Sequence, residues 1–289
     1  MSPDEKVYTS AAAFRQALEG RLLQNSRSTN MALERLRKHV AFDRFLARLF
    51  LDEPEATPRW LLKGGYSMEI RYSHIARMTK DVDLSIPKLK DPSPEMIQAM
   101  LVQAAEKDLK DWFVFRVGTH SVEMELPVYA GWRYPVETML AGKRFTTFHV
   151  DIAVGDAVVS APDWERGGEL LAFAGIPPVK AALLPREQQF AEKVHGYTMP
   201  RPEAERSRVK DFVDMVLLIE RNLSDKALVV KAIEATFERR KTHSIPKVLP
   251  APPAAWEGAY AEMAADCGVQ HKEMKGAYSF VSEYWGSLF

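Results

Sequence analysis

The segment "LLKGGYSMEIRYSHIARMTKDVDLSI", residues 61–86, contains two patterns that together decide the fold. A short apolar run ends at Gly64 and Gly65, and the residues after it predict the start of a helix. Backbone amides at a helix N-terminus can face an anion, and glycine has no Cβ to obstruct it. Further on, "DVDLSIP" alternates polar and apolar residues and predicts a strand with Asp81 and Asp83 on one face. The segment is either a tight turn before a solvated strand or a phosphate-binding turn beside a metal site.

The two aspartates favour the metal interpretation because like charges this close repel unless a cation lies between them. Magnesium binds through one or two carboxylates plus water and substrate phosphates, which this strand offers. A third carboxylate, Asp151, lies in the apolar segment "TTFHVDIAVGD", where its only nearby positive charge in sequence is His149. If this segment pairs with "DVDLSI", three acids converge and two magnesium ions become feasible. The alternative for Asp151 is a structural residue held in a salt bridge.

The composition of the whole chain is that of an ordinary globular protein. It has 289 residues, of which 46% are hydrophobic and 27% are charged. Lysine plus arginine and aspartate plus glutamate both number 39, so net charge neither indicates nor excludes a nucleic-acid partner. The single cysteine, Cys267, forms no internal disulfide, and no apolar run is long enough to span a membrane. We therefore expect a cytoplasmic protein without a membrane partner.

The order of predicted elements indicates an α+β fold in two parts. Two amphipathic helices are expected within 10–50 and another from Ser93, and the first half also has strand-like segments. After about residue 157, "SAPDWERGG" and "AGIPPVKAALLP" are expected to be loops, and helices dominate the rest. The predicted domains are 1–158, with N-terminal helices and an αβ core, and 159–289, which is helical. The strand-like segments and the later helices are expected in "WFVFRVG", "VEMELPVYA" and "RFTTFHVDIAV", and over 185–197, 206–222, 224–241 and 254–286.

The helical half supplies charged residues beside apolar stripes. In "REQQFAEKVHGY", Lys193 emerges at the edge of a stripe that includes Phe190 and Val194. In "ERSRVKDFVDMVLLIE", Arg208, Asp211 and Asp214 recur at a spacing of three residues and share one face of a helix. From this pattern alone, a structural row of ion pairs is the favoured interpretation.

Taken together, these segments resemble the AbiEii/AbiGii family of nucleotidyltransferase toxins, which includes the MenT toxins of toxin–antitoxin systems. The resemblance covers most of residues 31–250 and keeps the family's order. It is carried by "LERLRKHVAFDRFLARLF", "LLKGGYSMEIRY", "ARMTKDVDLSI", "FHVDIAVGD", "FAEKVHGY", "RSRVKDFVD" and "AIEATFERRKTHSIP".

The resemblance implies a DNA-polymerase-β-like nucleotidyltransferase core with a helical C-terminal domain. A nucleoside triphosphate and Mg²⁺, or alternatively Mn²⁺, would bind between the two parts. By position, Asp81, Lys193 and Asp211 correspond to catalytic residues, and Asp211 either orients Lys193 or acts as a base. The remaining correspondences are Asp81, Asp83 and Asp151 for metal, and Lys63, Gly64, Gly65, Ser67, Arg77 and Lys193 for the nucleotide.

The same resemblance implies transfer of a nucleoside monophosphate to the 3′ end of tRNA, which would block translation. A separately encoded cognate antitoxin would be the protein partner. Basic residues that could meet RNA phosphates are Arg201, Arg206, Arg208, Lys210 and the run "ERRKTH" at 238–243. Thr79 is expected on the metal face, where an attached phosphate or nucleotide would compete with the metal. The alternatives are nucleotidylation of a protein, a non-catalytic module that binds nucleotide or RNA, and a glycosyltransferase.

Overall fold

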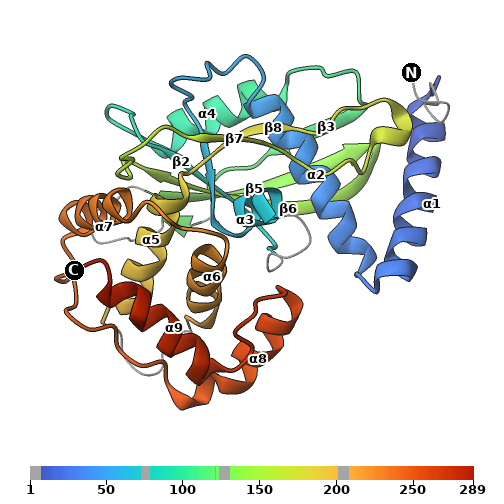
Figure 1. Ribbon diagram of the computed structural model, residues 1–289. Coiled ribbons are helices and arrows are strands. Elements are labelled where there is room, and N and C mark those ends of the chain that lie inside the picture. The colour runs from blue at the N-terminus through green and yellow to red at the C-terminus, as the bar shows by residue number, and fades with distance from the viewer. Residues whose placement is uncertain (1–7, 73–78, 121, 124–130, 201–207) are drawn as a thin grey trace.

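The computed structural model describes residues 8–72, 79–120, 122–123, 131–200 and 208–289 (Figure 1). The helices are α1 (Ala11–Thr29), α2 (Leu33–Leu49), α3 (Gly64–Tyr72), α4 (Pro94–Ala105), α5 (Arg186–Thr198), α6 (Val209–Glu220), α7 (Lys226–Arg240), α8 (Glu257–Asp266) and α9 (Met274–Gly286). The strands are β1 (Leu61–Lys63), β2 (Val82–Ile86), β3 (Phe113–Val117), β4 (Val122–Glu123), β5 (Gly131–Leu140), β6 (Lys143–Val154), β7 (Asp163–Arg166) and β8 (Lys180–Leu183). Short 3₁₀ turns occur at Ala172–Ala174 and Ala254–Trp256.

The strands form one mixed sheet in the order β3-β5-β6-β2-β1-β8-β7, and β4 pairs with β5. Strand β2 runs parallel to β6 and β1 parallel to β8, whereas the other neighbours are antiparallel. The predicted α+β class is confirmed. The central position of β2 is the feature that matters for function, because it places "VDLSI" between the glycine turn and the strand of Asp151.

Sequence patterns located the helices better than the strands. The hydroxyl of Ser10 accepts a hydrogen bond from the amide of Ala13, and that of Ser93 accepts one from Met96, so both predicted caps begin helices. The expectation of loops at "SAPDWERGG" and "AGIPPVKAALLP" was wrong, because these segments contribute β7 and β8. The sheet thus extends past residue 158, and the C-terminal helices begin with α5.

Strand β5 was not predicted at all, although it pairs with β3, β4 and β6. Its sequence, "GWRYPVETML", contains Pro135, which argues against an inner strand. Pro135 is tolerated because β3 has already ended there: the amide of Gly118, just after β3, donates to the carbonyl of Pro135. Of the expected strand "VEMELPVYA", only residues 122–123 belong to the described part of the chain.

The apolar interior forms two clusters that follow the chain. The first joins α1, α2, α4 and the sheet and ends at Leu184. The second joins α5 to α9 and begins in the chain with Met68 of α3, followed by Phe190. Helix α3 therefore contacts both clusters, and it is the helix that starts at the glycine turn.

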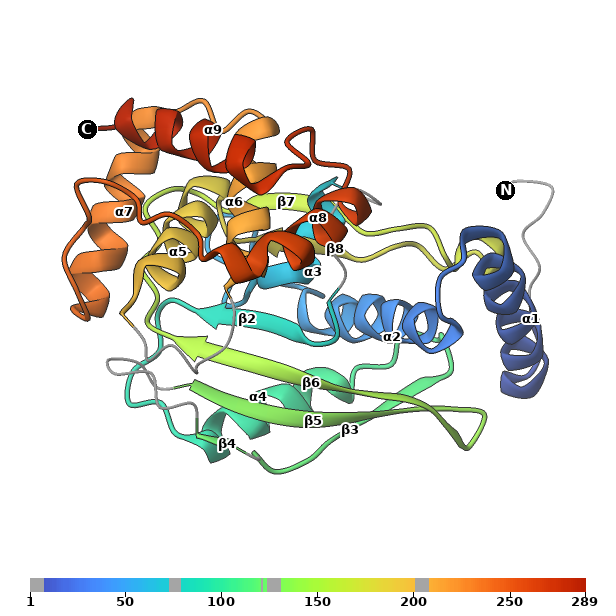
Figure 2. The same cartoon turned by 90° about the horizontal axis from the view of Figure 1, so that it is seen from below.

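The helices lie on opposite sides of the sheet. In Figure 1, α4 lies above the sheet and α5 to α9 lie below it, while α1 stands at one end. Figure 2, seen from below, shows β2, β6 and β5 facing the viewer with α4 behind them and α5 to α9 to one side. Among the described residues, none of the helices combines the length and the apolar character needed to cross a membrane.

Candidate active site

The turn between β1 and α3 requires glycine at position 64. Gly64 adopts a φ of +65°, in the left-handed region that other residues rarely enter. A Cβ at this position would lie 2.0 Å from Oδ2 of Asp83, so the carboxylate lies directly against the turn. Because the turn begins α3, this carboxylate also lies near a helix N-terminus, which favours negative charge. The turn and Asp83 form one packed unit.

Four charged residues form a row across four adjacent strands. Lys63 on β1 is opposite Asp83 on β2, Asp83 is opposite Asp151 on β6, and Asp151 is opposite Arg133 on β5. Residues directly opposite in a sheet project from the same face. The pairing on which convergence of the three acids depended is therefore present, and Asp81 lies two residues before Asp83, immediately before β2 begins.

Arg133 contacts two of the three acids. Its Nε and Nη2 donate to Oδ1 and Oδ2 of Asp151 at 2.7 and 2.6 Å, and Nη2 lies 3.7 Å from Oδ2 of Asp81. His149 Nδ1 lies 3.4 Å from Oδ1 of Asp81. The expectation that His149 alone offers positive charge near Asp151 was wrong. Alternation of Trp132, Tyr134 and Val136 in β5 was the signal that could have placed Arg133 on this face.

The donor set suits a divalent cation of the magnesium type. Among the described residues, no three His, Cys, Asp or Glu side chains are already arranged to hold one ion. Asp81 and Asp83 offer two carboxylates from one strand, and the side chain of Asp81 is 29% exposed to solvent. Magnesium needs only one or two carboxylates because it keeps several waters. The guanidinium of Arg133 already shows that positive charge is favoured between Asp151 and Asp81.

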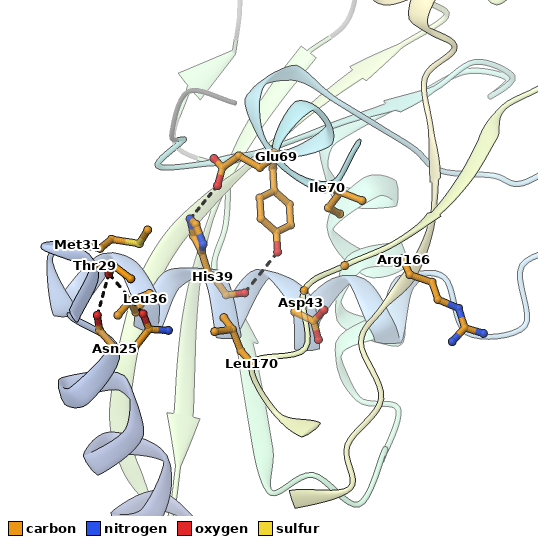
Figure 3. A pocket seen from close by; sticks show the side chains of 13 residues that line it. Asn25, Thr29, Met31, Leu36, His39, Asp43, Glu69, Ile70, Arg166 and Leu170 are labelled. Carbon is orange, nitrogen blue, oxygen red and sulfur yellow. Dashed lines mark hydrogen bonds and ion pairs between the residues drawn. The ribbon is translucent and has the colours of Figure 1, made fainter. Parts of the chain in front are cut away.

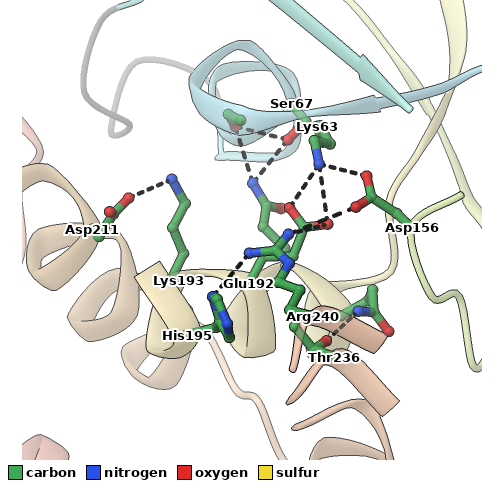
Figure 4. Close-up of polar contacts among 12 residues, drawn as sticks. Lys63, Ser67, Asp156, Glu192, Lys193, His195, Asp211, Thr236 and Arg240 are labelled. Atoms are coloured by element: carbon green, nitrogen blue, oxygen red, sulfur yellow. Dashed lines mark hydrogen bonds and ion pairs between the residues drawn. The ribbon is translucent and has the colours of Figure 1, made fainter. Parts of the chain in front are cut away.

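Lys193 on α5 is held by two carboxylates of α6, and Figure 4 shows its contact with Asp211. Its Nζ lies 3.0 Å from Oδ1 of Asp211 and 2.9 Å from Oδ2 of Asp214, whose side chain is buried. Arg208 Nη1 contacts the other oxygen of Asp211 at 3.0 Å. The row of ion pairs expected on this helix is present. The geometry also places Asp211 where it orients Lys193.

Lys63 lies within a buried cluster of ion pairs (Figure 4). Its Nζ donates to Asp156 at 2.7 Å and to both oxygens of Glu192 at 3.1 and 3.0 Å. Arg240 Nη2 lies 3.6 Å from Asp156 and 3.5 Å from Glu192. Burial alone would raise the pKa of Asp156, but the charges of Lys63 and Arg240 outweigh it and hold that pKa below its ordinary value. We call these four residues the inter-layer ion cluster, since they join β1, the segment after β6, α5 and α7.

Ser67 is a buried part of the turn. Its hydroxyl donates to the carbonyl of Gly64 at 2.9 Å and accepts from Nε2 of Gln189 at 2.9 Å. Gln189 also donates to the carbonyl of Gly64 at 3.0 Å. Gln189 was not singled out from the sequence, because a glutamine in an amphipathic helix gives no distinctive pattern. Together with Glu192 of the inter-layer ion cluster, it fixes α5 beside the glycine turn.

Of the predicted anion-binding residues, Arg77, Arg201 and Arg206 lie outside the described residues. Lys210 is exposed at the start of α6. In the basic run at 238–243, Arg239 and Arg240 make contacts within the protein. Arg239 Nε donates to the carbonyl of Gly155 at 2.8 Å, in addition to the contacts of Arg240.

Thr79 lies between the start of β2 and a cavity beside α3. The cavity has a volume of about 220 Å³ and is lined by His39 and Glu69 among others (Figure 3). Glu69 Oε2 lies 3.0 Å from His39 Nε2, and its Oε1 accepts from the amide of Thr79 at 2.7 Å. The hydroxyl of Thr79 donates to the carbonyl of Asp81 at 3.2 Å. Thr79 thus helps to fix the segment just before β2. Its modification stays a prediction.

A second hollow lies on the open part of the sheet beside the three acids. Its volume is about 470 Å³, and its lining includes Lys38, Arg116, Pro135 and His149. His149 is shared between this hollow and the contact with Asp81. The hollow therefore adjoins the side chain that contacts Asp81.

Comparisons with known proteins agree with this geometry. The profile of the family described as "Nucleotidyl transferase AbiEii toxin, Type IV TA system" matches residues 44–281. The fold is similar to that of MenT4, a nucleotidyltransferase toxin from Mycobacterium tuberculosis H37Rv, with a TM-score of 0.56 and 16% identity over 97% of this chain and 99% of that one. No curated protein sequence matches the chain. With its glycine turn, acid row and helical lysine inside the matched region, this chain belongs to the AbiEii family of nucleotidyltransferase toxins.

Proposed function

We propose that the protein transfers a nucleoside monophosphate from a nucleoside triphosphate to an acceptor hydroxyl. The acceptor oxygen attacks the α-phosphorus, the bond from that phosphorus to the bridging oxygen breaks, and pyrophosphate leaves. The observation that carries the proposal is the convergence of Asp81, Asp83 and Asp151 beside the glycine turn. Membership of the family supports a nucleotidyltransferase toxin with a triphosphate substrate and an antitoxin partner.

Asp81 and Asp83 would hold Mg²⁺, with Mn²⁺ as the substitute ion, and Asp151 is the third candidate ligand. The ion, when bound, would lower the pKa of the acceptor hydroxyl and offset charge on the leaving oxygens. The side chain of Asp81 is 29% exposed against 13% for Asp151, which supports Asp81 as the acid nearer to the acceptor.

Lys193 would bind the triphosphate from the opposite side, oriented by Asp211 and Asp214. Gly64 and Gly65 would leave the backbone amides of the turn open to phosphate. Arg77 is proposed as a further phosphate ligand. Lys63 is bound by the carboxylates of Asp156 and Glu192, so we propose that it holds the glycine turn against α5 rather than binding nucleotide.

We propose the 3′ end of tRNA as the acceptor. The hollow beside His149 supports an extended acceptor strand, because Lys38 and Arg116 line it and can face phosphates. Addition of nucleotides at that end would block aminoacylation and stop translation. We further propose that the antitoxin is encoded separately.

The experiment compares wild-type protein with Asp81→Asn. Each α-labelled triphosphate is incubated with Mg²⁺, total RNA and protein, and the labelled products are separated. We expect labelled tRNA from the wild type and at least about 100-fold less from Asp81→Asn, since an electrostatic contact to the reacting groups is lost. Asp91→Asn, in an exposed loop, is the control and should transfer at the wild-type rate.

The same separation of labelled products distinguishes the proposed transfer to tRNA from the alternative functions. Label on protein rather than on RNA would indicate nucleotidylation of a protein target. No label with any triphosphate would indicate a non-catalytic module that binds nucleotide or RNA. Full activity in a well-folded Asp81→Asn variant would reject the assignment of this site.

A further inference from the structure

Arg133 projects from the open face of the sheet into the cluster of acids. It is the register partner of Asp151, makes two hydrogen bonds to that carboxylate, and reaches towards Asp81 with the same nitrogen. A fork of two parallel bonds between a guanidinium and a carboxylate is among the stronger ion pairs in proteins. The side chain of Asp151 is only 13% exposed, so this pair is partly shielded from water.

Arg133 is a cation that lies among the three acids. The hydrogen bond to Asp151 raises the pKa of Arg133 further above its ordinary value, and the charges of Asp81 and Asp83 add to this effect. All three acids of the cluster therefore act on one guanidinium. Without a cation between them, three carboxylates on one face of neighbouring strands would repel one another. Arg133 supplies that cation from within the chain.

A guanidinium bound in this position has a consequence for metal binding. A divalent cation that uses Asp151 approaches oxygens that already accept hydrogen bonds from Arg133, and one that uses Asp81 meets the repulsion of a guanidinium whose Nη2 lies 3.7 Å from that carboxylate. We propose that Arg133 is a positioning residue that competes with the divalent cation for Asp151 and Asp81, so that it weakens metal binding in the absence of nucleotide. This inference rests on the metal site of the proposed function.

Release of Arg133 from Asp151 would link the binding of the cation to the binding of the triphosphate. When the cation takes its place, the guanidinium is left beside the metal face with its donors available. A triphosphate arriving with the cation offers acceptors that replace the oxygens of Asp151, and arginine binds phosphate in the same forked geometry. Metal and triphosphate therefore favour each other's binding through this one side chain. Lys63 and Lys193 do not couple the two in this way, because the carboxylates that bind them are not among the proposed metal ligands.

The test measures binding of Mn²⁺ alone to the full chain by the loss of the electron paramagnetic resonance signal of the free ion. We expect Arg133→Gln to bind Mn²⁺ about tenfold more tightly than the wild type, the scale of one charge-assisted hydrogen-bonded pair. Arg133→Lys keeps the positive charge but cannot make two parallel hydrogen bonds to Asp151. Its affinity for Mn²⁺ should lie between those of the wild type and Arg133→Gln. Arg116→Gln is the matched control, because Arg116 lies on the same face of the sheet and pairs with Glu137 rather than with the acids.

Four results decide the matter. Tightening in Arg133→Gln but not in Arg116→Gln supports competition, whereas equal tightening in both shows only a general effect of charge and overturns it. If Asp81→Asn loses Mn²⁺ binding while Arg133→Gln is unchanged, the inference fails and the metal site stands. If the wild type, Arg133→Gln and Asp81→Asn all fail to bind Mn²⁺, both fail together.

A second measurement keeps the inference testable if Arg133→Gln does not fold. The side-chain Nε–H signal of Arg133 is assigned in the wild type by its absence from the spectrum of Arg133→Lys. Saturation with Mg²⁺ should shift that signal as the bond to Asp151 breaks, while the signal of Arg116 stays in place. An unchanged Arg133 signal at saturation would overturn the proposal.

Discussion

At the scale of single residues, the candidate site depends on how closely backbone and carboxylate approach at the glycine turn. Gly64 and Gly142 both have positive φ, of 65° and 71°. They differ in surroundings, because a Cβ at Gly64 would collide with Asp83 whereas a Cβ at Gly142 would meet nothing within 4 Å. Backbone strain is common to both positions, but displacement of a predicted metal ligand is specific to one.

This difference gives a prediction for alanine at the two positions. Gly142→Ala should cost about 1 kcal/mol of unfolding free energy and leave transfer unchanged, because only the backbone is strained. Gly64→Ala should cost more, about 2–4 kcal/mol, and should abolish transfer because Asp83 must move. Chemical denaturation and the labelled-tRNA assay measure the two effects. Equal loss of activity in both variants would contradict the assigned role of the turn.

At the scale of elements, the sequence predicted those whose signals are local. Helices α1 and α4 were found because Ser10 and Ser93 cap them, and β2 because its alternation is uninterrupted. Strand β5 was not among the predicted strands; it contains Pro135, and whether a proline is tolerated depends on where the neighbouring strand ends. Missing β5 also meant missing Arg133. Strands β7 and β8 have four residues each, too few for a periodic pattern to be distinguished from a loop.

Helix α2 is anchored to the sheet by buried ion pairs that its sequence pattern did not indicate. Arg48 donates from both terminal nitrogens to Asp111, at 2.9 and 2.6 Å, and Nε of Arg44 reaches the same carboxylate at 2.8 Å. Burial alone would raise the pKa of Asp111, but the hydrogen bonds and charges of Arg48 and Arg44 outweigh it and lower that pKa. Asp111 is therefore ionised at neutral pH in the folded protein, where its carboxylate is the buried ion-pair partner of both Arg44 and Arg48.

We predict that Asp111→Ala destabilises the protein by about 3–5 kcal/mol, because it leaves two buried guanidinium groups without their acid. Since the folded pKa of Asp111 lies below its ordinary value of 3.8, its contribution is present at neutral pH and is lost as the pH falls below about 4. The variant should therefore lose less stability on acidification than the wild type. Asp108→Ala, which removes an exposed acid three residues earlier, should leave the unfolding curve unchanged.

At the scale of the whole molecule, the ordered set of motifs predicted which residues would meet but not how the two parts are joined. Convergence of Asp83 and Asp151 was expected on the condition that their strand segments pair, and these strands are neighbours. The inter-layer ion cluster left no such sign, because Lys63, Asp156, Glu192 and Arg240 are spread over 178 positions of the chain. Contacts of that kind arise from the tertiary fold, so a pattern within one short window does not contain them.

The inter-layer ion cluster gives the last prediction, which concerns the relation between the sheet and α5. Arg240→Ala should destabilise the protein by about 2–4 kcal/mol, since Asp156 and Glu192 are then left with Lys63 alone in a buried setting. It should also lower transfer, because α5 carries Lys193 and is held to the turn through Glu192. Denaturant unfolding gives the first effect, and amide exchange across residues 61–72 reports loosening of the turn. Lys241→Ala removes the exposed cation just after α7 and should match the wild type in denaturant unfolding and amide exchange. If the two variants behave alike, the cluster is a passive set of charges and the glycine turn is positioned by packing alone.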